Sequence, residues 1–412
     1  MTSRLIKTVA ATLAGAALLT VPLSAYASVT QPTLSEAAVT GVHALRGALV
    51  SAVPIATLTA AQLDAAAADF PDTPPARYGV TAYRLIYRTV DHYGRPTTAS
   101  GIVVLPDGRR GALTAVEYLH GTNATKAYAA SVDDTSTDRL VTALFAGAGL
   151  VGVAPDYLGL GLGPGLHPYI DTKTETTASA DLLLAARTFA AKHGVTLKRD
   201  VLVTGFSQGG RASLALGRAL SRGEAGPFRL GALQAVAGPY DLLGSELPAT
   251  FDGGVAPATA AFYLAYFVTA WNRTVGLYDD PREAFQEPYA DTVEGLFDGT
   301  HPDEEIVTKL PDSPEKLFTP EFAERLKHPT GRFLRALRAA DQICHDWTPR
   351  VPVHFYSGTK DTDVVAANAD SCATSLRARG AKVTVHSMGA VDHFGTAFAA
   401  FPQIIRAFGR WA

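Results

Sequence analysis

The hydrophobic pattern of the chain changes period many times, and each change separates a predicted strand from a predicted helix. Short apolar or β-branched runs are typical of buried strands, whereas apolar positions three or four apart indicate helices. Predicted strands cover residues 83–90 and 98–105 as a hairpin, then 113–119, 150–154, 201–204, 230–236, 351–356 and 382–386. Predicted helices cover residues 138–148, 177–193, 211–220 and 396–411. Because strands alternate with helices, we expect an α/β fold with a mainly parallel central sheet covered by helices on both faces.

This alternation stops between about residues 245 and 340. The interval holds an apolar helical run at 258–269, then turns rich in Asp and Pro, then further helical patterns. We interpret it as a helical cap or lid inserted between two strands, over the carboxyl ends where such sheets bind ligands. The run at 258–269 carries too many apolar groups for one solvent-facing helix surface. We therefore expect Leu264 and Phe267 to line or cover an acyl pocket, although a purely structural cap would have the same composition.

The amino terminus has the pattern of an export signal. Arg4 and Lys7 precede an apolar run at 9–23, and Ala25-Tyr26-Ala27 offers small residues for cleavage near Ala27. The apolar run is about 15 residues long, shorter than the roughly 20 that span a bilayer. We expect a secreted protein with a signal peptide at 1–27, an α/β core at 28–244 and 341–412, and the cap at 245–340.

Composition and charge exclude some classes of partner. The chain has 412 residues and a formal net charge of −3, which becomes about −5 without the predicted leader, so nothing basic is left to recruit nucleic acid. The only cysteines are Cys344 and Cys372, and an even count in an exported chain favours a disulfide over two separate buried thiols. No third ligand stands at a zinc-like spacing and there is no H-E-x-x-H, so no metal site is expected.

The stretch with the clearest chemistry is Gly205-Phe206-Ser207-Gln208-Gly209. A predicted strand runs straight into Ser207, and a predicted helix begins a few residues later. Such a reversal forces the apex into an unfavourable backbone conformation, and bulky residues two positions away would collide. The pattern matches the G-x-S-x-G nucleophile elbow, although an ordinary glycine–serine turn is the alternative. The elbow would place the Ser207 hydroxyl at a helix N-terminus, which favours developing negative charge.

A serine hydroxyl needs a base, and the base needs an orienting acid. Among the eleven histidines, His393 follows the last predicted strand in a loop, at the carboxyl edge of the sheet where the serine is expected. His354 and His386 lie inside strands and more naturally serve packing. Asp361 follows the preceding strand and is the predicted acid, with Asp363 as its rival.

The order Ser207, Asp361, His393 resembles that of the α/β-hydrolase family, and the resemblance extends from about residue 80 to the end. It implies an oxyanion hole made by the N–H of Gln208 and an N–H from the loop Leu119-His120-Gly121-Thr122-Asn123. Thr122 stands where the HGGG variant of that loop has glycine. The choice between Gly121 and Thr122 as second donor therefore stays open.

A second stretch narrows the resemblance. Residues 156–161 (DYLGLG), continuing to His167-Pro168-Tyr169, look like the loop after the fourth strand in secreted lipases and esterases of the fungal lipase A type and their bacterial relatives. That subfamily also carries a large helical lid between the same two strands. The glycines at 159–165 fit G-x-G-x-x-G in no frame, so no dinucleotide cofactor is expected.

The resemblance implies a secreted serine hydrolase, of carboxylesterase or triacylglycerol lipase type, that cleaves esters through an acyl-enzyme without a cofactor. Its partners would be a small-molecule or lipid ester and, for a lipase, a lipid surface. A peptidase or acyltransferase on the same fold is the closest alternative. A binding protein on a degenerate hydrolase scaffold is a more distant one.

Overall fold

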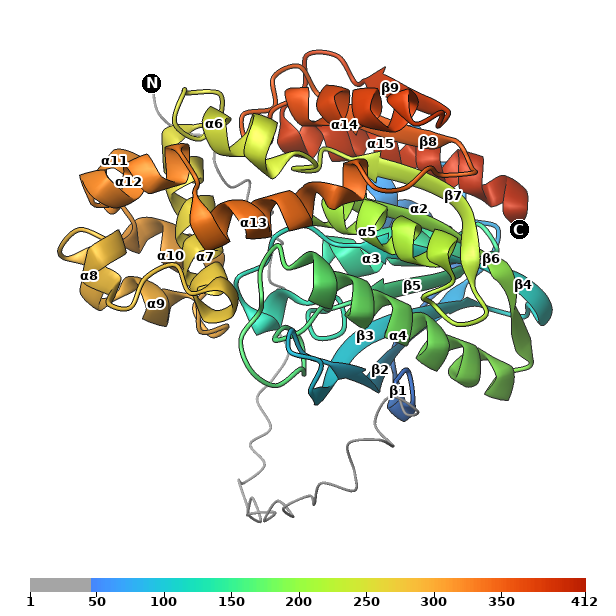
Figure 1. Ribbon diagram of the computed structural model, residues 1–412. Helices are drawn as coiled ribbons and strands as arrows, with labels where there is room; N and C mark the ends of the chain where they lie inside the picture. Colours follow the sequence, from blue (N-terminus) through green and yellow to red (C-terminus); the bar gives the residue numbers. More distant parts are fainter. Residues whose placement is uncertain (1–45) are drawn as a thin grey trace, which may run out of the picture. The chain divides into compact units, whose positions relative to one another are not determined.

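The computed structural model describes residues 46–412, so the predicted signal peptide lies outside the described residues. The described chain forms a nine-stranded sheet in the order β1-β2-β3-β5-β4-β6-β7-β8-β9 (Figure 1). The first three pairs in this order, β1–β2, β2–β3 and β3–β5, are antiparallel. The five remaining pairs, from β5–β4 to β8–β9, are parallel. The α/β prediction with a mainly parallel sheet is confirmed. The strands are β1 Leu49–Leu58, β2 Val80–Val90, β3 Pro96–Pro106, β4 Gly111–Leu119, β5 Val151–Pro155, β6 Val195–Phe206, β7 Arg229–Val236, β8 Val353–Ser357 and β9 Val383–Ser387.

The beginning of the described chain holds two elements that the hydrophobic pattern did not predict. β1 pairs with β2 at the edge of the sheet, and most of its side chains are exposed or half-buried. An edge strand buries little, so its apolar alternation is weak. The helix α2, Ala60–Ala66, begins with a capping box in which the Thr59 hydroxyl accepts from the Gln62 N–H. Thr-x-x-Gln was a readable signal for this helix start.

Helices cover both faces of the sheet. On one face, α4 (Thr172–Lys192), α5 (Gln208–Arg222) and α14 (Ala367–Ala378) pack on the strands through mainly aliphatic side chains. On the other face, α2, α3 (Thr137–Gly147) and α15 (His393–Phe408) form a second apolar layer. β4, β5 and β6 lie between these layers, which explains why their sequences read as continuous apolar runs. Several boundaries were wrong. The helices α15 and α4 begin at His393 and Thr172, three and five residues before their predicted starts, and β6 begins at Val195, six residues before its predicted start.

Residues 245–340, which we call the cap, form the long helix α7 and several short helices between β7 and β8, and these helices gather at one end of the sheet (Figure 1). Proline is the first residue of α7, α8, α11 and α12, where its fixed φ suits the first helical turn. The cap has an apolar core rich in aromatic side chains, and Tyr169 and Ile170 from the loop before α4 also belong to this core. The division of the chain into domains at residues 245 and 340 stays a prediction. The helices are α6 Leu247–Ala249, α7 Pro257–Val275, α8 Pro281–Ala284, α9 Val293–Leu296, α10 Asp303–Lys309, α11 Pro314–Leu317, α12 Pro320–Lys327 and α13 Gly331–Ala340.

Two tyrosines of α7 hold the cap against the loops at the carboxyl ends of the strands. The Tyr266 hydroxyl donates to the Asn123 carbonyl after β4 at 3.2 Å, and the Tyr263 hydroxyl donates to Asp363 after β8 at 3.4 Å. The cap therefore lies over the carboxyl ends of the strands, where Ser207 follows β6. Within residues 46–412, no helix is both long enough and apolar enough to cross a membrane.

Candidate active site

Ser207 occupies the one-residue turn between β6 and α5. Its backbone has φ +56° and ψ −123°, a conformation that non-glycine residues rarely adopt. A Cβ on Gly205 would come within 2.2 Å of the Gly209 carbonyl oxygen, and one on Gly209 within 1.9 Å of the Leu119 carbonyl oxygen. Glycine is therefore required on both sides of the serine, for the steric reason that the sequence pattern indicated.

His393 and Asp361 lie together at the same sheet edge. His393 Nδ1 is 2.7 Å from Asp361 Oδ2, and both side chains are almost fully buried. The other oxygen of Asp361, Oδ1, accepts the N–H groups of Asp363 and Val364 at 3.0 and 2.9 Å. His393 is the first residue of α15 and not part of a loop, because Asp392 caps the helix by accepting the Gly395 N–H at 2.8 Å. The carboxylate is thus held in place while it orients the imidazole.

Asp363, the rival acid, faces a different partner. Its carboxylate accepts the hydroxyl of Tyr263 in the cap, and no hydrogen bond joins it to His393 in the described chain. Burial raises the pKa of Asp363, and the neighbouring His393 opposes that rise. The geometry pairs Asp361, and not Asp363, with the histidine.

The second ring nitrogen of His393, Nε2, makes no hydrogen bond in the described chain. His393 Nε2 is buried and has no hydrogen-bond partner within residues 46–412. Ser207 and His393 line the same pocket, but the structure contains no hydrogen bond between them. In free enzymes, serine–histidine contacts are often long and shorten when substrate binds. The arrangement leaves Nε2 available to accept a proton inside the pocket that Ser207 lines.

Three residues near the serine, Gln208, Gly121 and Thr122, have backbone N–H groups with no hydrogen-bond acceptor among residues 46–412. Gln208 is the first residue of α5, so its N–H has no intrahelical partner. Gly121 lies beside the serine, since a Cβ added to it would stand 3.4 Å from Ser207 Cβ. Gly121 and Thr122 line the same pocket as Ser207.

His120 fixes the orientation of the peptide between Gly121 and Thr122. Its Nδ1 lies 2.7 Å from the Gly121 carbonyl oxygen, and its ring packs on Tyr157 with centroids 4.3 Å apart. The Thr122 hydroxyl forms a 2.8 Å hydrogen bond with the Tyr169 hydroxyl. In a trans peptide the C=O and N–H point in opposite directions. The Thr122 N–H therefore points away from the His120 ring.

A buried polar network beneath the elbow was not predicted from the sequence. The side-chain amide of Gln208 donates to Glu175 Oε1 at 2.8 Å and lies 3.0 Å from His167 Nε2. Burial raises the pKa of Glu175 to about 7 and lowers that of His167 to about 4. Glu175 lies in the first turn of α4, where an acidic residue is ordinary. Only the resemblance of the loop containing His167 pointed to this region.

Two pockets meet at Ser207. The first, which we call the apolar pocket, includes both cap residues predicted to line an acyl site, Leu264 and Phe267. Phe267 also packs on Trp271, with ring centroids 4.4 Å apart, so it belongs to the cap core as well. The second, which we call the polar pocket, contains His393 and the loop after β4. The apolar pocket is lined by Tyr169, Ile170, Ser207, Gln208, Pro239, Leu242, Glu246, Leu247, Thr250, Tyr263, Leu264, Phe267, Leu337 and Val364.

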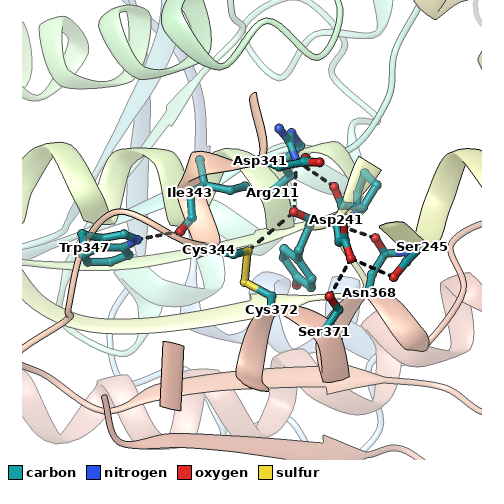
Figure 2. The surroundings of a disulfide bond; sticks show 12 residues. Arg211, Asp241, Ser245, Asp341, Ile343, Cys344, Trp347, Asn368, Ser371 and Cys372 are labelled. Carbon is teal, nitrogen blue, oxygen red and sulfur yellow. Dashed lines mark hydrogen bonds and ion pairs between the residues drawn. A yellow bond between two sulfur atoms is a disulfide. The ribbon is translucent and has the colours of Figure 1, made fainter. Parts of the chain in front are cut away.

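The predicted disulfide is present. Cys344 and Cys372 are bonded, with Cα atoms 5.1 Å apart, and the bond links the segment before β8 to α14 (Figure 2). Beside it, Asp241 accepts hydrogen bonds from Ser245 and Ser371. The alternative of two separate thiols was therefore wrong. The disulfide and this cluster fix the helix that follows the loop of Asp361.

The histidines His354 and His386, outside the pocket of Ser207, contact each other on the sheet. His354 and His386 stack with ring centroids 5.2 Å apart and are joined by a 2.9 Å hydrogen bond between Nδ1 and Nε2. Tyr356 stacks on His386, so this pair packs on the sheet as expected. Over residues 46–412, no group of three or more His, Cys, Asp or Glu side chains is arranged to hold a metal ion.

Comparison with known proteins finds similarity in three dimensions only. No family model and no curated protein sequence matches the chain. A candidate hydrolase from Legionella pneumophila is 24% identical, with a TM-score of 0.78 over 88% of this chain and 98% of that one. The rice cell wall degrading esterase LipA from Xanthomonas oryzae is 26% identical, with a TM-score of 0.76 over 88% and 97% of the two chains.

A more distant structure shares the architecture. Candida antarctica lipase A is 14% identical, with a TM-score of 0.60 over 84% of this chain and 78% of that one. At this identity the likeness concerns the fold alone. The sheet order, the strained serine turn and these neighbours agree: the chain has the α/β-hydrolase fold, which it shares with the esterase and the lipase among these structures.

Proposed function

We propose that the protein is a secreted serine hydrolase that cleaves carboxylic esters through an acyl-enzyme on Ser207. One observation carries the proposal: the buried pair His393–Asp361 leaves Nε2 unpaired in the pocket that Ser207 lines. The esterase and lipase among the structural neighbours support the same reaction class. Their sequences are too different to transfer a substrate.

In the proposed mechanism, the Ser207 hydroxyl attacks the ester carbonyl carbon while His393 Nε2 takes its proton. Asp361 accepts the Nδ1–H of the resulting imidazolium and stabilises its charge. The tetrahedral intermediate collapses, His393 gives the proton to the leaving alkoxide, and the alcohol departs. Water, deprotonated by His393, then attacks the acyl-enzyme and releases the carboxylic acid and free Ser207.

The negative charge on the tetrahedral intermediate needs fixed donors. We assign the Gln208 N–H as one donor, because it opens α5 directly after the serine. We assign the Thr122 N–H as the other, because His120 binds the Gly121 carbonyl and directs the Thr122 N–H away from itself. Loss of one such donor typically costs about 3 to 4 kcal/mol of transition-state stabilisation.

The two pockets suggest how an ester would bind. His393 must reach the leaving oxygen, and it lines the polar pocket but not the apolar pocket. The alcohol part would therefore occupy the polar pocket and the acyl chain the apolar pocket, between Leu264 and Phe267. Phe394, at the polar pocket, is 59% exposed and supports contact with a lipid surface at the entrance.

Export is part of the proposal. The signal pattern ending near Ala27 and the disulfide Cys344–Cys372 both fit an oxidising compartment. Amino-terminal sequencing of protein recovered from a culture medium or periplasm tests it. A first residue close to Ser28 supports cleavage there, whereas recovery only from the cytoplasm would contradict it.

The reaction class is tested with two substrate panels. p-Nitrophenyl esters from acetate to palmitate should be hydrolysed, and aminoacyl anilides should not. A fluorophosphonate probe should label Ser207, as mass spectrometry of the labelled peptide can verify. Faster cleavage of the anilides than of the esters would favour a peptidase. Transfer of the acyl group to an added alcohol in preference to water would favour an acyltransferase. Absence of labelling would favour a binding protein.

A further inference from the structure

The apolar pocket contains one carboxyl group. Glu246 is the last residue of the π-helix η5 (Leu242–Glu246), immediately before α6, and it is partly buried. It lines the pocket together with Ser207 and the cap residues Leu264 and Phe267. π-Helical turns are rare and occur frequently at functional sites. A carboxyl group in a pocket that otherwise suits a hydrocarbon chain requires an explanation.

One oxygen of this carboxyl group is bound and the other is not. Glu246 Oε2 accepts the Asn368 side-chain amide at 2.6 Å and the Val365 N–H at 3.3 Å. No donor and no cationic side chain within residues 46–412 contacts Oε1. Burial, opposed by the two hydrogen bonds and reinforced by Asp361 and Asp363, raises the pKa of Glu246 to about 8. At neutral pH the group is mainly a neutral carboxylic acid, which can both donate and accept a hydrogen bond.

Apart from Ser207 and Gln208, the other polar side chains around the pocket already have partners. The Tyr263 hydroxyl is bound by Asp363, the Tyr169 hydroxyl by Thr122, and the Thr250 hydroxyl by the Leu247 carbonyl. The amide oxygen of Gln208 is unpaired but fully buried. Apart from the Ser207 hydroxyl, which the proposed reaction uses, Oε1 of Glu246 is therefore the polar side-chain atom of the described pocket that is left for a ligand.

We propose that Glu246 selects acyl chains that carry a hydroxyl group, a conclusion that rests on the proposed esterase function. A plain hydrocarbon chain would remove water from Oε1 and leave it unpaired, which is costly. A chain hydroxyl can accept from the protonated carboxyl or donate to the ionised one, so it fits either state. An ammonium group would have to lose its water in a largely apolar pocket whose acid is mostly uncharged. The structure thus favours hydroxyacyl esters over both unsubstituted and aminoacyl esters.

The test compares matched p-nitrophenyl esters of fatty acids with and without a chain hydroxyl, together with an aminoacyl ester. The proteins are wild type, Glu246→Gln, Glu246→Leu and the exposed control Glu321→Gln in α12. We expect the wild type to prefer the hydroxyacyl ester in kcat/KM, and Glu246→Leu to reduce that preference on the order of tenfold. Glu246→Gln, whose amide also donates and accepts, should retain most of it, and Glu321→Gln all of it.

A structural role for Glu246 predicts a different result. If Glu246→Leu lowers the melting temperature but keeps the wild-type ratio between the two acyl esters, the residue only ties the cap to α14 and the proposal is overturned. A wild-type preference for the plain or the aminoacyl ester overturns it as well. Binding of the matched methyl esters to Ser207→Ala protein, measured without turnover, separates the two ideas. We expect Ser207→Ala protein to bind the hydroxyacyl methyl ester more tightly than the plain one. This result would support the role of Glu246 even if the wild-type protein cleaved no ester, an outcome that would disprove only the esterase function.

Discussion

The sheet edge that holds Ser207, Asp361 and His393 is built differently from the cap above it. In the core, Ser207 directly follows the long strand β6, Asp361 lies in the loop after β8, and His393 is the first residue of the long helix α15, so the backbone sets their positions. In the cap, mostly short helices are held together by aromatic contacts, such as the stack of Tyr266 on Phe297 at 4.6 Å. The reaction geometry therefore depends on backbone, whereas the shape of the apolar pocket depends on side-chain packing.

This difference predicts that substitutions in the two regions affect different properties of the protein. Core substitutions at the reacting groups should remove activity and keep the fold. Cap substitutions should change substrate preference or stability, and residues at the junction should affect stability most. The following experiments test that division.

The largest effect is expected at the serine and its base. Ser207→Ala and His393→Ala should each lower kcat by about 10⁴ to 10⁶-fold, because residues that act as a unit fail together. Circular dichroism and the melting temperature should remain close to wild type. Ser221→Ala, at the exposed end of α5, is the matched control and should retain full activity. Near-normal turnover in purified Ser207→Ala protein would disprove the proposed mechanism.

The junction between core and cap contains a buried ion pair. Arg211 of α5 is fully buried and lies 3.4 Å from Asp341, which also accepts the N–H groups of Leu242 and Leu243 at 3.0 Å each. Asp341→Asn would leave the guanidinium uncompensated and turn an amide donor toward one of those N–H groups. We expect a loss of about 3 to 5 kcal/mol in the free energy of unfolding, measured with urea.

The more exposed pair Arg218–Asp346 is the control for that prediction. Asp346→Asn should cost about 1 kcal/mol or less, because solvent screens the charges. Equal losses in the two variants would show that burial at the junction does not matter.

The disulfide should contribute slightly less than the buried pair. Cys344 and Cys372 are 28 positions apart, and closing a loop of this length stabilises by about 3 to 4 kcal/mol in the chain-entropy description. Reduction should lower the melting temperature of the wild type and leave the double variant Cys344→Ala/Cys372→Ala unchanged. A shift of the same size in both proteins would mean that the reductant acts elsewhere.

The network beneath the elbow predicts a pH dependence. Burial raises the pKa of Glu175 to about 7 from an ordinary value of 4.5. Between these values the unfolded chain releases the proton and the folded protein keeps it, so stability falls as pH rises, by at most about 1.4 kcal/mol per pH unit. Glu175→Gln stays neutral and lacks this contribution. Unfolding curves from pH 4.5 to 8 should therefore diverge up to about pH 7 and then run parallel, whereas parallel curves throughout would refute the assignment.

The smallest effect is expected in acyl-chain preference. Leu264→Ala and Phe267→Ala enlarge the apolar pocket, so the optimum among p-nitrophenyl esters should move to longer chains, by about 0.8 kcal/mol for each additional methylene buried. Leu326→Ala, in the cap core but not at the pocket, should lose stability and keep the wild-type optimum. If all three variants only lose stability, Leu264 and Phe267 are structural cap residues.

Much of the core could be predicted because its signals are local. The strand and helix periods, the two glycines around Ser207 and the position of His393 after the last strand are all readable in short windows. The burial of Glu175 could not be predicted, because an acidic residue in the first turn of a helix is normally solvent-exposed. β1 was missed since an edge strand has little apolar alternation to read.

The sequence by itself determined the fold class, the strained turn at Ser207 and the candidate residues Asp361 and His393, because backbone conformation follows from residue type and spacing. Only the tertiary structure decided which aspartate meets His393, which way the Thr122 N–H points, and that Glu246 lies in the apolar pocket. These three outcomes depend on contacts between segments far apart in the chain. Such contacts are selected by packing in three dimensions, which no local pattern encodes.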